Sequence, residues 1–225
     1  MKPRRTGTAG EPAGGPPAAL RARAQRIVSG LRRLHPDADC ALRHDSALQL
    51  LVATILSAQC TDERVNQVTP RLFSRYRGAR DYAEAAPAEL EELIRSTGFF
   101  RNKAKSIIGL GRALIDEFRG EVPGRMEDLL RLPGVGRKTA NVLLGSWFGR
   151  PAIPVDTHVA RLAGRLELTA ERDPVKIESA LQGLLPQRDW TFTSHALIWH
   201  GRRVCLARRP ACSACGIAGD CPFPR

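Results

Sequence analysis

The architecture of this chain follows from seven residues, Leu132-Pro133-Gly134-Val135-Gly136-Arg137-Lys138. They separate two segments with helical patterns, 126–131 and 137–148. Two glycines that flank one apolar residue permit a tight turn with left-handed dihedral angles. Val135 can pack such a turn against its own pair of helices. The seven residues therefore predict a helix–hairpin–helix unit.

The same hairpin predicts an anion site. The backbone amides of Gly134 and Gly136 would point outward at the start of the second helix, where the positive end of the helix dipole reinforces them. Arg137 follows directly and adds a positive charge. Such a site suits a DNA phosphate and carries no information about the base.

Lys138 lies in the first turn of the second helix, where the helix dipole disfavours a cation. This position favours either phosphate contact or nucleophilic catalysis by a neutral amine, and an ordinary solvated lysine is the alternative. Only five of the 35 basic residues are lysines, so a Schiff-base mechanism has few side chains to choose from. The sequence thus predicts Lys138 as a catalytic or phosphate-binding residue.

A second cluster of informative residues lies near the C-terminus and comprises Cys205, Cys212, Cys215 and Cys221, in the spacing C-x6-C-x2-C-x5-C. Thiolates this close together can share one metal ion or cluster. The spacing is neither that of two C-x-x-C pairs with a long insert nor that of a bacterial ferredoxin. A structural zinc ion and an iron–sulfur cluster both stay open at this point. Cys40 and Cys60 are interpreted as ordinary thiols.

Composition narrows the class of protein. The net charge of +12 over 225 residues indicates an anionic partner, which can be nucleic acid, an anionic membrane or an acidic protein. The most apolar stretch, 48–58, is too short to span a bilayer, and no signal peptide is visible. Six cysteines without a secretory signal indicate a reducing interior. We expect a cytoplasmic monomer with no membrane association, and a disordered basic tail over residues 1–17.

Apolar periodicity predicts an all-α fold, because no segment alternates with the period of two that a half-buried strand requires. Pro36, Gly120 and Asp173-Pro174 mark helix ends or starts. The predicted helices cover 18–34, 46–59, a segment from 61 onward, 80–85, 87–96, 102–118, 126–131, 137–148, 157–166, 175–184 and 189–204.

Five motifs carry a resemblance to a known family: Leu56-Ser57-Ala58-Gln59-x-Thr61-Asp62, the hairpin, Val155-Asp156-Thr157-His158, His200-Gly201-Arg202 and the cysteine loop. In this order and spacing, over about residues 25–222, the chain resembles the bacterial endonuclease III family, which are DNA glycosylases and abasic-site lyases. The resemblance implies two helical domains with DNA across the cleft between them. Residues 41–154 would form a six-helix domain with the hairpin, and residues 18–40 and 155–225 a domain that carries a [4Fe–4S] cluster on the four cysteines.

The resemblance also implies a reaction. Lys138 would attack C1′ of a flipped nucleotide and form a Schiff base, and Asp156 would assist by stabilising charge and moving protons. The residues alone favour an ordinary helix N-cap for Asp156, which is compatible with catalysis because a cap holds a carboxylate rigidly. The implied substrate is double-stranded DNA with oxidised pyrimidines or abasic sites, in the nucleoid of a bacterium.

The resemblance implies DNA contacts for two further positions, and charge indicates them for two arginines. Gln59 would fill the gap that the flipped base leaves. Phe99 matches the family's apolar wedge, which is commonly leucine, and Phe100 could share this role. Arg208 and Arg209, inside the first cysteine loop, would meet phosphates.

Two other functions stay open from sequence. An adenine-mismatch glycosylase would share the hairpin and the cysteines, but it is expected to lack the lysine and to carry a glutamate in the helix 46–59, where this chain has no carboxylate. A non-catalytic DNA-binding protein with a structural zinc site would explain the charge, the hairpin and the cysteines. It would not explain Lys138 together with Asp156.

Overall fold

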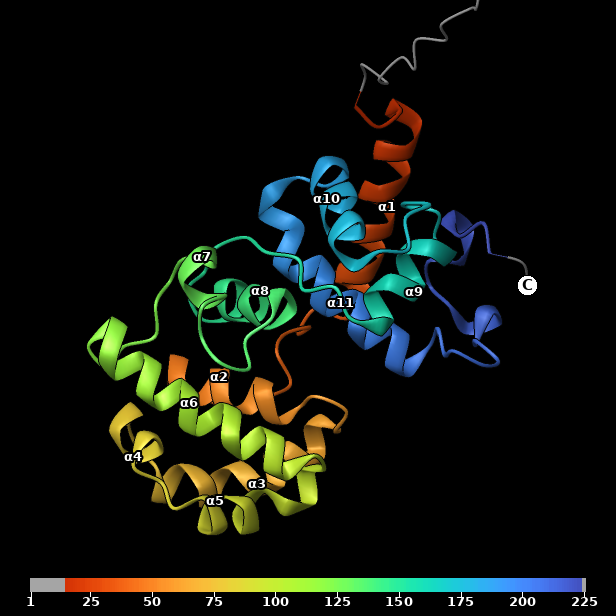
Figure 1. The fold of residues 1–225 in the computed structure, drawn as a ribbon. Helices are drawn as coiled ribbons and strands as arrows, with labels where there is room; N and C mark the ends of the chain where they lie inside the picture. The colour runs from red at the N-terminus through yellow and green to blue at the C-terminus, as the bar shows by residue number, and fades with distance from the viewer. Residues whose placement is uncertain (1–14, 224–225) are drawn as a thin grey trace, which may run out of the picture.

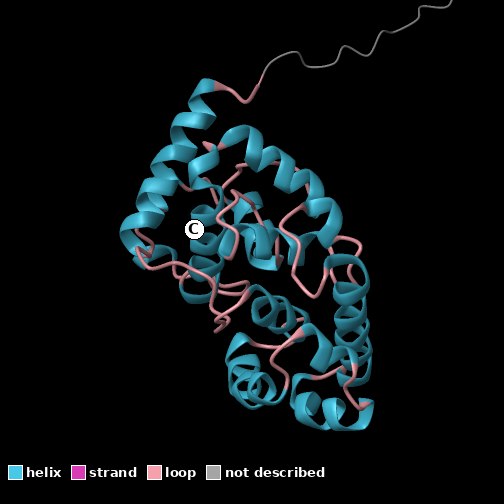
Figure 2. Ribbon diagram, turned by 90° about the vertical axis from the view of Figure 1, so that its left-hand side faces the viewer, coloured by secondary structure: helices cyan, strands magenta, loops and turns pink. Residues whose placement is uncertain are grey.

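The computed structural model describes residues 15–223, and this part of the chain is built of helices and loops without a strand (Figures 1 and 2). The predicted all-α class is confirmed. Most of the predicted disordered tail, residues 1–14, lies outside the described residues. In the described range no helix is long and apolar enough to cross a membrane.

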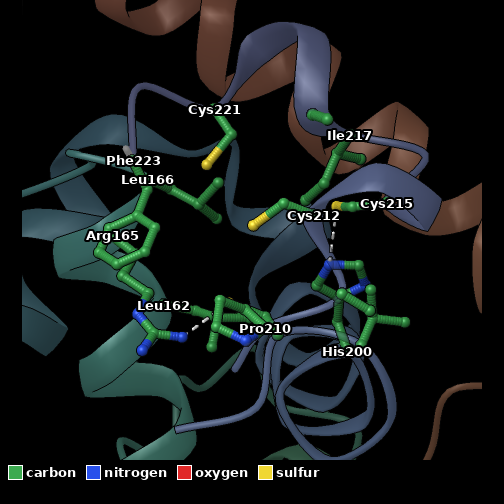
Figure 3. A pocket seen from close by; sticks show the side chains of 14 residues that line it. Leu162, Arg165, Leu166, His200, Pro210, Cys212, Cys215, Ile217, Cys221 and Phe223 are labelled. Carbon is green, nitrogen blue, oxygen red and sulfur yellow. Dashed lines mark hydrogen bonds between the residues drawn. The ribbon is translucent and has the colours of Figure 1, made fainter. Parts of the chain in front are cut away.

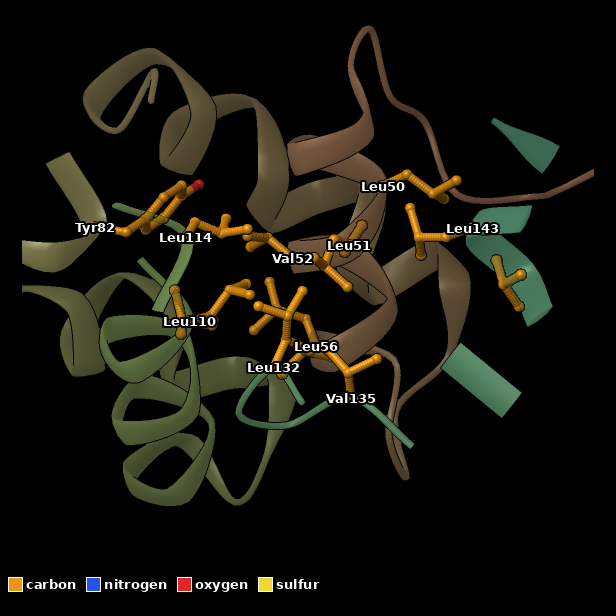
Figure 4. Close-up of a cluster of buried hydrophobic side chains, with 14 of the residues drawn as sticks. Leu50, Leu51, Val52, Leu56, Tyr82, Leu110, Leu114, Leu132, Val135 and Leu143 are labelled. Atoms are coloured by element: carbon orange, nitrogen blue, oxygen red, sulfur yellow. The ribbon is translucent and has the colours of Figure 1, made fainter. Parts of the chain in front are cut away.

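The middle of the chain forms six helices and the single-turn α7, packed around one hydrophobic cluster (Figure 1). Their bounds are α2 Ala47–Leu56, α3 Asp62–Arg75, α4 Ala79–Ala83, α5 Pro87–Ile94, α6 Phe100–Phe118, α7 Met126–Leu129 and α8 Arg137–Ser146. The predicted cap at Ser46 is present, because its hydroxyl accepts a bond from the Gln49 amide at 3.2 Å. Helix α2 is apolar on nearly every face and lies at the centre of the cluster (Figure 4).

The two ends of the described chain meet around a second hydrophobic cluster. It is formed by α1 Ala18–Leu34, α9 Thr157–Arg165, α10 Pro174–Leu184 and α11 Trp190–Arg203. The core residues change from one cluster to the other between Ala38 and Leu42 and again between Ala152 and Ile153. These crossings lie close to the predicted borders at 40 and 155, and the division into two domains stays a prediction.

Helix ends differ from prediction where turns follow. Helix α2 ends at Leu56, three residues before the predicted end at Gln59. Gln59 instead adopts a left-handed conformation with φ of 53°. The last helix begins one residue late, after a short 3₁₀ turn, Gln187–Asp189. Two further 3₁₀ turns, Cys212–Ala214 and Ala218–Asp220, shape the cysteine loop and were not predicted, since single turns leave no periodic pattern.

Candidate active site and cysteine pocket

The hairpin has the predicted tight turn. Val135 is 8% exposed and packs in the first cluster, and its amide donates to the Leu132 carbonyl at 3.1 Å. Gly134 has φ of +80°, and a Cβ added there would lie 2.9 Å from the Ser106 Cβ, so glycine is required. Gly136 has an ordinary φ of −97°, so the left-handed conformation of the turn lies at Gly134.

The start of α8 carries unpaired backbone donors. Gly136 is the N-cap and supplies no side-chain bond, and in residues 15–223 no acceptor reaches the amides of Gly136, Arg137 or Lys138. A Cβ added at Gly136 would meet no atom within 4 Å, so open space lies in front of these amides. Unpaired amides at the positive end of a helix are suited to bind an anion.

The Arg137 side chain is already paired within the protein. Its Nε and Nη2 donate to the Glu178 carboxylate of α10 at 2.8 and 2.9 Å, and this carboxylate is almost wholly buried. The pair connects the hairpin helix to the second hydrophobic cluster. The Arg137 guanidinium, which sequence analysis assigned to DNA, is therefore occupied in an ion pair, whereas its backbone amide is free.

Lys138 and Asp156 line one pocket, which lies between the two hydrophobic clusters. Lys138 comes from the first turn of α8 and is exposed to solvent, whereas Asp156 immediately precedes α9 and is half-buried. The pocket is also lined by Thr54 of α2, Val142 of α8 and Trp199 of α11. Helices of both clusters thus place an amine and a carboxylate at the same pocket.

Asp156 is the N-cap of α9, as the residues alone suggested. Its Oδ1 accepts from the backbone amides of His158 and Val159, both at 2.8 Å. Within the described residues no donor reaches Oδ2. One oxygen is therefore used to hold the side chain rigidly, and the other stays available for chemistry in the pocket.

Three other groups in the pocket wall were assigned no role from sequence, although Asp62 and Arg202 belong to the motifs that carry the resemblance. Arg202 of α11 donates to the carboxylate of Asp62, at the start of α3, at 2.7 Å, and so connects the two sides of the pocket. His195 is buried against Ser146, and burial lowers the pKa of its imidazole, although nearby Asp39 and Asp156 oppose this shift.

Gln59 and Phe99 lie exposed on two loops of the first cluster. Both adopt left-handed backbone conformations, with φ of 53° and 47°, which non-glycine residues seldom do. Phe99 is 63% exposed. Phe100 instead packs against the first cluster, with the guanidinium groups of Arg95 and Arg101 5.7 and 5.6 Å from its ring centre.

The four C-terminal cysteines line one pocket at the edge of the second cluster (Figure 3). In the part of the chain that the structure describes, no three His, Cys, Asp or Glu side chains converge as closely as a single metal ion requires. The thiols surround a cavity with mostly apolar walls. Burial raises the pKa of the Cys215 thiol, and the other three cysteines add to this rise.

Two side chains from outside the cysteine loop lie next to the thiols. Arg165 of α9 places Nη1 3.2 Å from the Cys205 sulfur and also donates to the carbonyls of Leu206 and Ala207. The His200 Nε2 lies 3.4 Å from the Cys215 sulfur (Figure 3). Burial, with a smaller contribution from His35, lowers the pKa of His200 to about 4, so this imidazole is neutral at pH 7.

Arg208 and Arg209 lie on the loop that Arg165 holds, between the first two cysteines. Both side chains are exposed, and neither forms an ion pair within residues 15–223. They are therefore free to meet an external anion.

Comparisons with known proteins agree on one family. Residues 52–187 match the family model described as the HhH-GPD superfamily base excision DNA repair protein. The chain is 56% identical to Endonuclease III of Synechocystis sp., over 91% of this chain and 94% of that protein. It is 45% identical to Endonuclease III of Bacillus subtilis, over 84% and 86% of the two chains.

Solved structures are similar over nearly the whole chain. An endonuclease III bound non-covalently to DNA has a TM-score of 0.86 and 43% identity, with 90% of this chain and 95% of that chain covered. A trapped covalent endonuclease III–DNA intermediate has the same score, identity and coverage.

Proposed function

Since the chain belongs to the endonuclease III family of the HhH-GPD superfamily, we propose that Lys138 is the nucleophile of a base excision repair enzyme. The enzyme is a DNA glycosylase that also cleaves abasic sites. The observation that carries the proposal is the meeting of Lys138 and Asp156 at one pocket beside the unpaired amides of α8. A phosphate on these amides would bring the sugar of an extruded nucleotide to the amine.

The proposed reaction uses the amine of Lys138 and the carboxylate of Asp156. The C1′ atom of a nucleotide stacked in the duplex is inaccessible, so the damaged nucleotide is first flipped out. The neutral amine of Lys138 attacks C1′, and the C1′–base bond breaks with its electron pair leaving on the base, which takes up a proton. Ring opening gives a Schiff base between Nζ and C1′. Removal of a proton from C2′ then breaks the C3′–O bond, and the strand is cut with loss of the 3′ phosphate.

Asp156 supports these steps through the oxygen that its cap leaves free. Its negative charge stabilises the cationic sugar that develops as the base departs. The same oxygen can accept and return protons while Oδ1 keeps the side chain in place. Oxidised pyrimidines and abasic sites in duplex DNA are the substrates that we infer, for a monomeric enzyme that acts on the bacterial nucleoid.

Borohydride trapping tests the proposed function. The protein is mixed with a duplex that carries thymine glycol, and with one that carries an abasic site, in the presence of sodium borohydride. A Schiff base is reduced to a stable covalent adduct, which gel electrophoresis detects. The absence of an adduct on both duplexes would contradict lysine-based catalysis.

Exposure distinguishes the two candidate wedges, because Phe99 projects into solvent and Phe100 packs against the first cluster. We predict that Phe99→Ala lowers the single-turnover rate on duplex thymine glycol by about tenfold, since base stacking on an aromatic ring contributes about 1–3 kcal/mol. Phe100→Ala should instead lower the free energy of unfolding by about 2 kcal/mol, because partly buried apolar area is lost. An unchanged rate in Phe99→Ala would remove Phe99 as the wedge.

We also propose that the four cysteines hold a [4Fe–4S] cluster. Four thiols around a cavity fit a cluster of several irons better than one zinc ion, which draws its ligands to about 2.3 Å. Clustered thiolates repel one another, and bound iron would offset this repulsion. Arg165 and His200 would place N–H groups beside two of the sulfurs. The cluster supplies structural cross-links, and the held loop presents Arg208 and Arg209 to phosphates.

Metal analysis tests the cofactor. Protein purified without oxygen should be yellow-brown and contain about four irons and four sulfides per chain. Cys212→Ser should lose iron, whereas Cys60→Ser, outside the pocket, should keep it. A colourless protein with one zinc ion per chain would contradict the cluster.

A further inference from the structure

Lys103 is a buried cation that the proposed reaction does not use. Of the four lysines in the described range, it alone is buried, with 5% of its surface exposed. Its Nζ donates to two backbone carbonyls, those of Leu56 and Thr97, each at 2.7 Å. Its charge is stabilised by main-chain acceptors, because no carboxylate in the described residues pairs with it.

The two acceptors occupy related places in the fold. Leu56 is the last residue of α2, and Thr97 is the last residue of the 3₁₀ helix Arg95–Thr97. Carbonyls at the end of a helix have no partner inside it and carry its partial negative charge, so they stabilise a cation. The ammonium of Lys103 thus joins the ends of two elements that are 41 residues apart in the chain.

Each of these elements is followed directly by a loop that we propose to contact DNA. Gln59 follows Leu56 by three residues, and Phe99 follows Thr97 by two. Both loop residues are exposed, and both adopt the strained left-handed conformation. Strained conformations persist only where the surrounding structure holds them.

We propose that Lys103 is a positioning residue that couples the two loops, so that Gln59 and Phe99 enter the DNA as one rigid pair. The inference rests on the proposed function and deepens it. A residue that fills the gap and a residue that wedges the stack must act on the same base-pair step. Their separation has to match the spacing of the bases before contact, because an error of about 1 Å can cost a hundredfold in rate.

The test measures cleavage of two substrates by the wild type and by two variants, Lys103→Met and Lys105→Met. Lys103→Met keeps the length of the side chain and removes its donors, and Lys105→Met removes an exposed charge two residues further along α6. Single-turnover cleavage is measured on duplex thymine glycol, which requires flipping, and on a single-stranded abasic oligonucleotide, which does not. Rates are normalised to the fraction of protein that borohydride traps, so that misfolded molecules are not counted.

We expect Lys103→Met to slow the duplex reaction by about tenfold or more and to leave the single-strand reaction within about twofold. Lys105→Met should keep the ratio of the two rates at the wild-type value. An equal loss on both substrates, or an unchanged ratio, would overturn the positioning role. If Lys103→Met yields no soluble protein, Lys103→Gln, which is shorter and lacks the ammonium that bonds both carbonyls, is tested against the same criterion.

The same experiment separates this inference from the function on which it rests. A wild-type protein that cleaves neither substrate and forms no adduct would refute the proposed function itself. A wild-type protein that cleaves both, with a normal rate ratio in the soluble Lys103 variant, would refute the coupling alone.

Discussion

Replacement of Lys138 by glutamine is expected to abolish the borohydride adduct and to lower strand cleavage by at least about 10³-fold. The amide has no basic lone pair, so it cannot form the bond to C1′. The fold should tolerate the change, because the side chain is exposed and forms no bond or ion pair in residues 15–223. Removal of a cation from a helix start should even stabilise the protein by a few tenths of a kcal/mol.

Lys176 provides a matched control. It is also exposed and also lies in the first turn of a helix, α10, but it is not among the residues that line the pocket. Lys176→Gln should trap and cleave like the wild type. Persistence of the adduct in Lys138→Gln would show that another amine is the nucleophile, and peptide mapping of the reduced adduct would identify it.

Substitution of Asp156 should separate its two roles. The change Asp156→Asn is not expected to disturb the cap, because asparagine caps helices about as well as aspartate. The charge that supports the cationic sugar would be lost, so we expect this variant to cleave about 10²-fold more slowly with a nearly unchanged free energy of unfolding. Asp156→Ala should lose the same activity and, in addition, about 1 kcal/mol of stability.

The chain contains a control for the cap alone. Asp173 caps α10 in the same way, since its Oδ1 accepts from the amides of Val175 and Lys176 at 3.0 Å each. Asp173→Ala should lose about 1 kcal/mol of stability and keep its activity. If Asp156→Asn cleaves as fast as the wild type, then Asp156 is a structural cap only. Urea unfolding and single-turnover cleavage measure the two effects.

The parts of the structure that depend on local patterns could be predicted from sequence. Ser46 and Asp173 mark helix starts, because a cap acts within three residues of itself. The burial of Val135 likewise follows from the residues next to it in the hairpin. The pairing of Arg137 with Glu178 joins residues 41 positions apart, and no periodicity indicates such a partner. Sequence analysis therefore did not identify the partner of Arg137, and the assignment of this residue to DNA stays a prediction.

Lys103 is a second residue whose contacts the sequence does not indicate. Lysine is seldom buried, and the two carbonyls that accept from its ammonium lie on other elements, α2 and a 3₁₀ helix. The cysteine loop was recognisable from its spacing, but its two single-turn helices and the side chains behind its sulfurs were not. Contacts between distant segments accordingly account for most of what was missed.

During synthesis on the ribosome, helix α1 emerges well before the helices that cover its apolar face. Its apolar residues Ile27 and Leu31 are fully buried in the cluster that α10 and α11 complete, and these two helices are synthesised much later than α1. At about 5–20 residues per second, α1 waits on the order of ten seconds for its partners, while all of α2–α8 is made and can fold. During this interval an apolar helix face is open to aggregation or to chaperones. The arginines at 21, 23, 26, 32 and 33 keep the waiting helix strongly charged.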